Sequence, residues 1–262
     1  MLSALSPARR RLLLVVGALV AGVVVLVATL ILRQLSAESV SSVRQDRPGP
    51  VLLVPGYGGS TTSLAALAAE LDRTGREVSV VELVGDGKGD LRIQAQELAD
   101  AAEVAMAAAG AESVDVVGYS AGGVIARLWV RDFGGAGQAR RVVSLGSPHH
   151  GTDLVDLARG VTPDSCPVAC RQLAPDSEFI ARLNARDETP AGPAFVSVWT
   201  TLDEVVTPPE TARLDGALNV SLQSICADSR ARHGDLPGDP VVAAIVDDAL
   251  GAGPPTAPRT CP

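Results

Sequence analysis

Short apolar segments alternate with helical patterns through most of the chain, and this alternation constrains the fold more than any other feature of the sequence. Strand-length apolar segments recur from residue 51 onward, with longer helical stretches between them. Such alternation is typical of a parallel sheet with helices on both faces. The predicted strands are Val51–Val54, Val78–Leu83, Val114–Val117, Arg141–Leu145, Phe195–Thr200 and Leu218–Ser221. We therefore expect an α/β domain with a mostly parallel sheet of about six strands.

Capping residues and periodicity place helices between these strands. The predicted helices run from Thr62 or Ser63 to about Arg73, from Asp90 to Ala109, from near Ser177 to Arg186, and from Val241 to Leu250. Residues 151–193 are rich in Pro and Asp and contain only the third of these helices. Because so long a segment outside the sheet pattern usually covers or serves a site, we expect it to form a cap on a domain spanning residues 51–262.

A long uncharged segment lies near the N-terminus. Three arginines, residues 9–11, precede Leu12–Leu32, in which Thr29 is the one polar residue. At about 1.5 Å per residue this segment spans roughly 31 Å, enough to cross the hydrocarbon core of a bilayer. We predict a membrane anchor over residues 1–33 with its N-terminus inside, then a flexible linker over residues 34–50 and an extracytoplasmic domain. A cleaved signal peptide and a buried core helix are the alternatives.

Charge is divided unevenly along the chain. Residues 1–50 carry six basic and two acidic side chains, which leaves 16 basic and 28 acidic side chains in the remainder. Because an acidic domain repels phosphate backbones, this balance argues against a nucleic acid as partner.

Four cysteines, Cys166, Cys170, Cys226 and Cys261, allow three disulfide pairings. Their spacing favours a local bridge between Cys166 and Cys170, which leaves Cys226 and Cys261 to hold the C-terminal tail. Disulfides persist in oxidising compartments, so these pairs agree with a domain outside the cytoplasm. Zinc is the alternative, but the first two cysteines have no second Cys or His pair nearby, and we predict no metal.

Residues Gly118 to Gly122 read Gly-Tyr-Ser-Ala-Gly and lie between a predicted strand and a helical pattern. In a strand–turn–helix setting, a G-x-S-x-G sequence is typical of a sharp turn that exposes a nucleophilic serine, here Ser120. Small residues at Gly118 and Gly122 permit such a turn. The alternative is an ordinary strand–helix connection with an incidental serine.

A serine hydroxyl needs a base and an orienting acid to act as a nucleophile. Of the three histidines, His233 follows the last strand, whereas His149 and His150 belong to the loop after an earlier strand. Asp203 directly follows the predicted strand Phe195–Thr200, with Glu204 as its competitor. We predict Ser120, His233 and Asp203 as the catalytic residues, and expect His149 and His150 to shape their loop.

Stabilising an oxyanion requires backbone N–H groups that point at the developing charge. The residue after the serine, Ala121, is one predicted donor. The loop Pro55–Gly59 follows the first strand, and its glycines, Gly56 among them, let the backbone approach a substrate, so the amide of Tyr57 is the second. This loop lacks the spacing and the lysine of phosphate-binding loops, which argues against a nucleotide.

Taken together, these segments resemble the class 2 bacterial lipases, typified by the minimal Bacillus lipase A-like enzymes and their actinobacterial relatives. The segments that carry the resemblance are Pro55–Gly59, Gly85–Asp90, Gly118–Gly122, Gly146–Thr152, Asp203–Val206, Leu214–Val220 and His233, in this order between Val51 and Leu250. The resemblance implies a minimal α/β-hydrolase fold with six strands, and hydrolysis of carboxylic esters through an acyl-enzyme without a cofactor. The sequence departs from the family at Pro55, where many relatives have histidine, and in the long segment 151–193.

Residues and resemblance together predict a serine esterase or lipase that acts on acyl esters or lipids outside the cytoplasm. The same three residues could instead cleave thioesters, phospholipid acyl esters, polyesters or amides, because a fold does not choose among these bonds. A non-enzymatic, anchored binding protein with a hydrolase-like fold is a second alternative. Segment 151–193 could be a mobile lid or a fixed cap, and a bridge between Cys166 and Cys170 favours the cap because it would stiffen the segment.

Overall fold

In the computed structural model the chain forms two units, residues 1–40 and residues 41–262. The structure describes residues 7–37, 43–155, 166–258 and 260–261. The middle of the predicted cap, residues 156–165, therefore lies outside the described residues.

The first unit contains helix α1 (Pro7–Ala37), which extends four residues beyond the predicted end of the anchor. Its side chains are described mainly over residues 15–29, where all are exposed. Among the described residues, no helix is both long enough and apolar enough to cross a membrane. The structure therefore does not support the predicted span Leu12–Leu32, of which side chains 12–14 and 30–32 lie outside the described residues.

The second unit is built on one six-stranded sheet in the order β2-β1-β3-β4-β5-β6, and every neighbouring pair is parallel. The strands are β1 (Val51–Val54), β2 (Val78–Val80), β3 (Val114–Tyr119), β4 (Ala139–Leu145), β5 (Ala194–Trp199) and β6 (Leu218–Ser221). The predicted parallel sheet of about six strands is confirmed.

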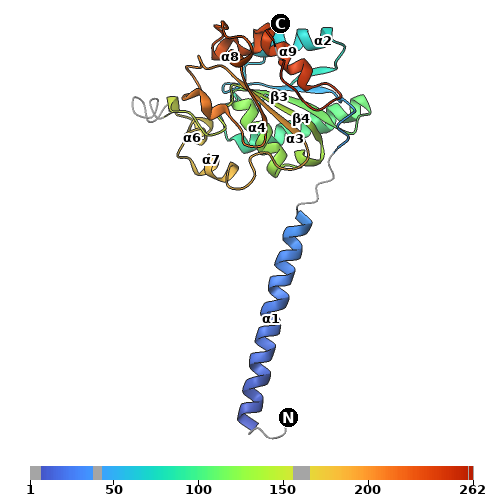
Figure 1. Ribbon diagram of the computed structural model, residues 1–262, viewed down its shortest axis with the longest axis vertical. Helices are drawn as coiled ribbons and strands as arrows, with labels where there is room; N and C mark the ends of the chain where they lie inside the picture. The colour runs from blue at the N-terminus through green and yellow to red at the C-terminus, as the bar shows by residue number, and fades with distance from the viewer. Residues whose placement is uncertain (1–6, 38–42, 156–165, 259, 262) are drawn as a thin grey trace. The chain divides into compact units, whose positions relative to one another are not determined.

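Helices cover both faces of this sheet because its strands carry apolar side chains on both sides (Figure 1). Leu52 and Val54 of β1 point into a core shared with α3 (Leu91–Ala109) and α4 (Ala121–Asp132). Val51 and Leu53 point into a second core with α2 (Ala65–Arg73) and α9 (Pro240–Ala249). The side-chain alternation of period two thus divides one strand between two cores.

Several element boundaries differ from the predicted ones. Strand β2 ends at Val80 rather than Leu83, because its partner β1 is only four residues long. Strand β4 begins two residues earlier than predicted, at Ala139. A short 3-10 helix, Thr61–Leu64, precedes α2 where a single helix was expected. As predicted, Asp90 caps α3 through its side chain.

Buried charge explains the early start of β4. The guanidinium of Arg140 is fully buried, lies 2.5 Å from the carboxylate of Asp115, and donates to the carbonyls of Leu250 and Gly251 at the end of α9. Burial outweighs this neighbouring cation and raises the pKa of Asp115 to about 6. Further hydrogen bonds of this kind stabilise a buried pair, although Arg140 Nε and Asp115 Oδ1 have no hydrogen-bond partner among the described residues. A sequence pattern does not reveal these contacts.

The same charged cluster binds part of the predicted linker. Arg140 donates to the carbonyl of Gln45, Arg141 donates to the Gln45 side chain, and the Asp115 amide donates to the carbonyl of Pro50. The second half of the predicted linker is therefore held against the sheet.

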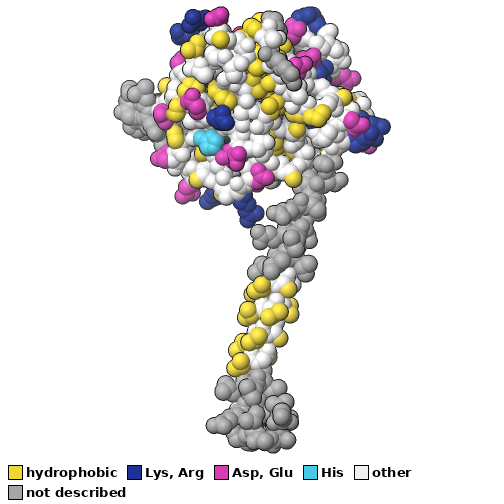
Figure 2. Space-filling view, viewed as in Figure 1, with side chains coloured by type: hydrophobic (Ala, Val, Ile, Leu, Met, Phe, Trp, Pro, Cys, Tyr) yellow, Lys and Arg dark blue, Asp and Glu magenta, His cyan; other side chains and the backbone are white. Residues whose placement is uncertain are grey.

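Both predicted disulfides are present, between Cys166 and Cys170 and between Cys226 and Cys261. The first bridge spans the start of α6 (Val168–Gln172), a short helix that the sequence did not predict. The predicted helix near Ser177 is α7 (Glu178–Leu183), and the Ser177 side chain caps it. On the visible face of this unit, acidic and basic side chains are scattered rather than gathered into one basic patch (Figure 2).

Candidate active site

Ser120 lies at the turn between β3 and α4, in a strained backbone conformation. Its φ is +54°, and it is the one non-glycine residue with positive φ among the described residues. Such a conformation is costly for a residue with a Cβ and is concentrated at functional sites. The turn leaves Ser120 half-buried at the carboxyl edge of the sheet, where β1 and β3 end in register.

The glycines of the motif are required by contact distances. A Cβ on Gly118 would lie 2.5 Å from the backbone of Gly122, and a Cβ on Gly122 would lie 2.2 Å from the carbonyl oxygen of Val54. A Cβ on Gly56 would lie 3.0 Å from that of Ser120. Side chains at these positions would push the turn away from β1, so the three predicted glycines hold the serine close to the loop after β1.

His233 brings its imidazole to Ser120. It begins the 3-10 helix η6 (His233–Gly238), which leads into α9, and its ring nitrogen Nε2 lies 3.1 Å from Ser120 Oγ. The histidine is 5% exposed. This distance is within hydrogen-bonding range of the proton that a general base would remove.

Asp203 contacts the other side of the same ring. Its Oδ2 lies 2.8 Å from His233 Nδ1, and its Oδ1 accepts hydrogen bonds from the amides of Val205 and Val206. These two amides fix the carboxylate in its orientation toward the imidazole. Glu204 is half exposed and lies 3.7 Å from the guanidinium of Arg232 instead. The structure thus brings together Ser120, His233 and Asp203, and leaves Glu204 at the surface.

Two residues near Ser120 have backbone amides without an acceptor among the described residues. The amide of Ala121 lies at the N-terminus of α4, and that of Tyr57 lies in the loop after β1, which Gly59 closes by donating to the Gly56 carbonyl. Neither amide donates to another residue in the described part of the chain. A free pair of this kind next to the serine is what a developing oxyanion needs.

An apolar cavity of about 260 Å³ opens at the serine. It is bounded by the loops after β1 and β4, by residues of the insertion, and by the loop that carries Asp203. Its lining residues are Tyr57, Ser120, Pro148, Thr152, Leu154, Val155, Cys170, Leu173, Val205 and Val206. Most of this lining is hydrocarbon, so the cavity suits an apolar group of a ligand.

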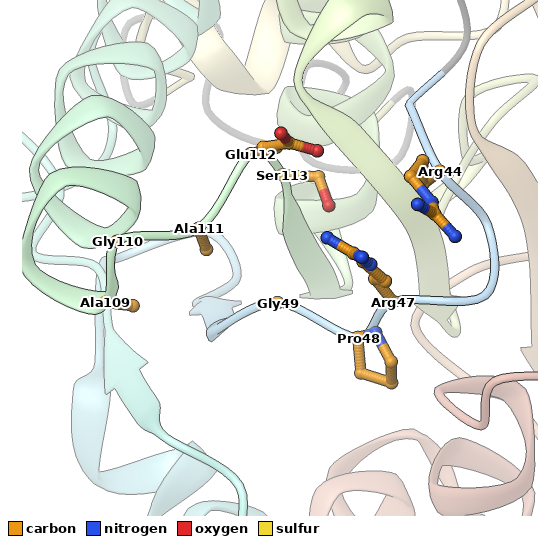
Figure 3. Close-up of a pocket in the computed structure, with 9 residues that line it drawn as sticks. All are labelled: Arg44, Arg47, Pro48, Gly49, Ala109, Gly110, Ala111, Glu112 and Ser113. Carbon is orange, nitrogen blue, oxygen red and sulfur yellow. The ribbon is translucent and has the colours of Figure 1, made fainter.

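A second cavity, of about 310 Å³, lies at the opposite edge of the sheet (Figure 3). It is found where Gly49 precedes β1 and Ser113 precedes β3, and the linker arginines Arg44 and Arg47 line it. No histidine is among its lining residues, so a serine there has no base of the kind found at Ser120.

The two remaining histidines do not reach Ser120 Oγ. His149 is fully buried, its Nε2 lies 2.9 Å from Ser144 Oγ, and burial together with the nearby Arg127 cation holds its pKa well below the ordinary value. His150 contacts Glu188 at 2.8 Å. These contacts join the loop after β4 to β4 itself and to the insertion, in agreement with the structural part predicted for both histidines.

The described parts of the insertion are hydrogen-bonded to the domain at both ends. Near its start, Thr152 Oγ1 donates to the Val205 carbonyl and accepts from the Thr207 amide. Farther along, the amide side chain of Gln172 contacts the Leu91 amide and the Asp90 carboxylate at the start of α3. These contacts favour a fixed cap in the described residues.

Sequence reasoning missed two residues that shape the site. Gly146 has a φ of +54°, and a Cβ there would lie 3.2 Å from His233 Nδ1 and 3.3 Å from Asp203 Oδ2. Tyr119 lies against the His233 ring at a centroid distance of 5.2 Å. Tyr119 lies within the Gly118–Gly122 motif, and Gly146 begins the segment Gly146–Thr152 that carries part of the family resemblance; these places in the sequence were the available signals.

Comparison with known proteins agrees with this topology. The sequence profile of the alpha/beta hydrolase fold matches residues 49–165. No curated protein matches the chain. The profile and the six-stranded parallel sheet together show an α/β-hydrolase fold, whereas the narrower resemblance to class 2 bacterial lipases stays a prediction.

Several solved structures are similar. Lipase B of Aspergillus fumigatus aligns with a TM-score of 0.67 and 20% identity over 82% of this chain and 56% of its own. The Bacillus licheniformis lipase BlEst2 aligns in its propeptide form with a TM-score of 0.66 and 19% identity, over 82% of this chain and 52% of its own. Its mature form aligns with a TM-score of 0.63 and 19% identity, over 78% of this chain and 92% of its own. The chain thus spans about half the length of the first two, and these likenesses show the fold.

The two acids after β5 make a direct test of the geometry. Replacing Asp203 with Asn should slow the reaction of Ser120 with a fluorophosphonate by about 10²-fold or more, because an amide does not hold or stabilise the imidazole as a carboxylate does. The matched variant Glu204→Gln should react within about threefold of the wild-type rate, since exposed ion pairs contribute little. Labelling rates from intact-protein mass spectrometry measure both, and the opposite ranking would contradict this assignment.

Proposed function

We propose that the protein is a serine hydrolase that cleaves carboxylic esters through an acyl-enzyme on Ser120. The observation that carries the proposal is the continuous set of contacts from Asp203 through His233 to Ser120, beside two free amides and an apolar cavity. The α/β-hydrolase fold supports it, since that fold presents a serine of this kind at the same edge of the sheet.

Each group has a defined part in the proposed reaction. His233 Nε2 takes the proton of Ser120 Oγ as the oxygen attacks the carbonyl carbon of the ester. The amides of Tyr57 and Ala121 donate to the resulting oxyanion. Collapse of this intermediate expels the alcohol, which receives its proton from His233. Water then attacks the acyl-enzyme with the same assistance and releases the acid and free Ser120.

The acyl side of the substrate is an apolar chain. Of the ten residues that line the cavity of about 260 Å³, five are Leu or Val. The size of this cavity limits the apolar group that it can hold. The half-exposed Leu154 stands at this cavity, where it can limit the length of the chain.

We propose that the N-terminal helix is a single-pass membrane anchor and that the domain lies on the outer side of the membrane, as expected from the sequence. Support comes from the arginines before the apolar segment, from the two disulfides, and from the exposed valines and leucines between residues 15 and 27 of α1. Apolar side chains spread around a helix require burial by something outside it, and a bilayer is the matching environment.

The first test concerns the nucleophile. The Ser120→Ala variant should lose hydrolysis of p-nitrophenyl butyrate by about 10⁴-fold or more while its circular dichroism and melting temperature stay near wild type. Ser147→Ala is the matched control, because that serine is buried in a neighbouring loop and its hydroxyl has no hydrogen-bond partner among the described residues. Wild-type protein with no turnover of butyrate, thioester or amide substrates, and no fluorophosphonate label on Ser120, would refute the proposal and favour a binding protein.

The second test concerns chain length. Replacing Leu154 with Trp should reduce kcat/KM for p-nitrophenyl octanoate by about tenfold or more and leave the acetate ester nearly unaffected, because the larger ring fills the cavity. Val168→Trp is the control, since Val168 is similarly exposed on the same insertion but does not line the cavity. An equal fall for acetate and octanoate would show that the cavity does not hold the acyl chain.

The third test concerns the anchor. Full-length protein expressed in a bacterial host should sediment with membranes and resist extraction by alkaline carbonate, and a variant lacking residues 1–40 should be released. Protease added to intact spheroplasts should degrade the domain if it faces outward. An N-terminus mapped after the apolar segment, in protein recovered from the medium, would establish the cleaved signal peptide instead.

A further inference from the structure

Tyr119 makes two contacts with His233 that the proposed mechanism does not use. Its phenol oxygen lies 3.2 Å from the backbone carbonyl oxygen of His233, to which it donates a hydrogen bond. Its ring lies beside the imidazole, with centroids 5.2 Å apart and an angle of 34° between the planes. Because Tyr119 immediately precedes the serine on β3, one residue joins the turn of the nucleophile directly to the loop of the base.

We propose that Tyr119 is a positioning residue for His233, holding the loop of the base through its hydroxyl and supporting the protonated imidazole through its ring. This inference rests on the proposed function, since it assigns a residue to the same reaction. It adds Tyr119 to Ser120, His233 and Asp203, as the residue that keeps the imidazole at the serine.

The Tyr119 hydroxyl remains a hydrogen-bond donor over the whole pH range of the proposed reaction. Burial, followed by the negative charges of Asp203, Asp235 and Glu204, raises the pKa of Tyr119 to about 12. The phenol therefore keeps its proton, and its bond to the His233 carbonyl persists, at any pH at which His233 can act as a base. A hydroxyl that titrated in this range would release the loop as the pH rose.

The Tyr119 ring also stabilises His233 electrostatically. His233 gains a positive charge when it takes the proton of Ser120, and an aromatic face within about 6 Å attracts a cation. The titratable groups in contact with this imidazole are Asp203 at Nδ1, the Ser120 hydroxyl at Nε2 and Tyr119 at its side. The adjoining loops also carry Asp235, Glu204 and the cation Arg232, and Arg232 lies 3.7 Å from Glu204.

The ring also has little freedom to leave this place. Tyr119 is half-buried and packs against the core that β1 shares with α2 and α9. This packing holds the ring beside His233 and limits its movement.

Two variants separate the hydroxyl from the ring. In Tyr119→Phe, kcat for p-nitrophenyl butyrate should fall about three- to tenfold with KM within twofold, because one hydrogen bond to the loop is lost. In Tyr119→Leu, kcat should fall further, and the acid limb of the kcat/KM profile should move to lower pH by about half a unit. The sign follows because losing the aromatic face destabilises the imidazolium, so His233 stays neutral to a lower pH.

The control is Thr74→Val, which removes a hydroxyl bonded to the Leu71 carbonyl at the end of α2. It should leave kcat and the pH profile unchanged. Wild-type kcat in both Tyr119 variants would overturn the inference. It would also be overturned if Tyr119→Leu lost melting temperature and active fraction while the acid limb of its pH profile stayed in place.

In either case, turnover and Ser120 labelling of the wild-type protein would leave the proposed function standing. Wild-type protein without turnover or labelling would contradict both the proposed function and this inference.

Discussion

The strained backbone of Ser120 is the constraint on which the rest of the site depends. A non-glycine residue at φ +54° costs about 1–3 kcal/mol, and the surrounding contacts must hold it there. Glycine would relieve the strain, as at Gly146, which has the same φ. The chain instead keeps a side chain at position 120, and the hydroxyl of that side chain explains why the strain is retained.

Close backbone contacts hold this turn. The approach of Gly122 to the Val54 carbonyl brings the start of α4, with Ala121, against the end of β1 and the loop that carries Tyr57. The neighbouring strands then end near the same edge, with Leu145 of β4 opposite Tyr119 and Val198 of β5 opposite Leu145. Loops that follow these strands, including the one with Asp203, must therefore meet beside Ser120.

The sequence predicts those parts of the structure that depend on local pattern and chain order. The strands β1 and β6, the Asp90 cap and the set Ser120, Asp203 and His233 follow from periodicity, capping and position after strands. It does not predict the start of β4, because Arg140 looks like a surface residue until Asp115 and the Leu250 carbonyl at the end of α9 are placed beside it. The sequence favours Asp203 over Glu204 by position, but it does not predict the two backbone amides that orient the Asp203 carboxylate.

His149 and His233 show why burial alone does not make a base. Both rings are at most 5% exposed and follow strands of the same sheet. The Nε2 of His149 meets a hydroxyl, its Nδ1 has no partner among the described residues, and a buried arginine lies nearby, so a proton on this ring would add an uncompensated buried charge. His233 instead has a carboxylate at Nδ1, a hydroxyl at Nε2 and an aromatic ring at its side. Its surroundings can stabilise the charged form that the proposed proton transfer creates. That difference in partners, rather than depth in the fold, separates the structural histidine from the proposed base.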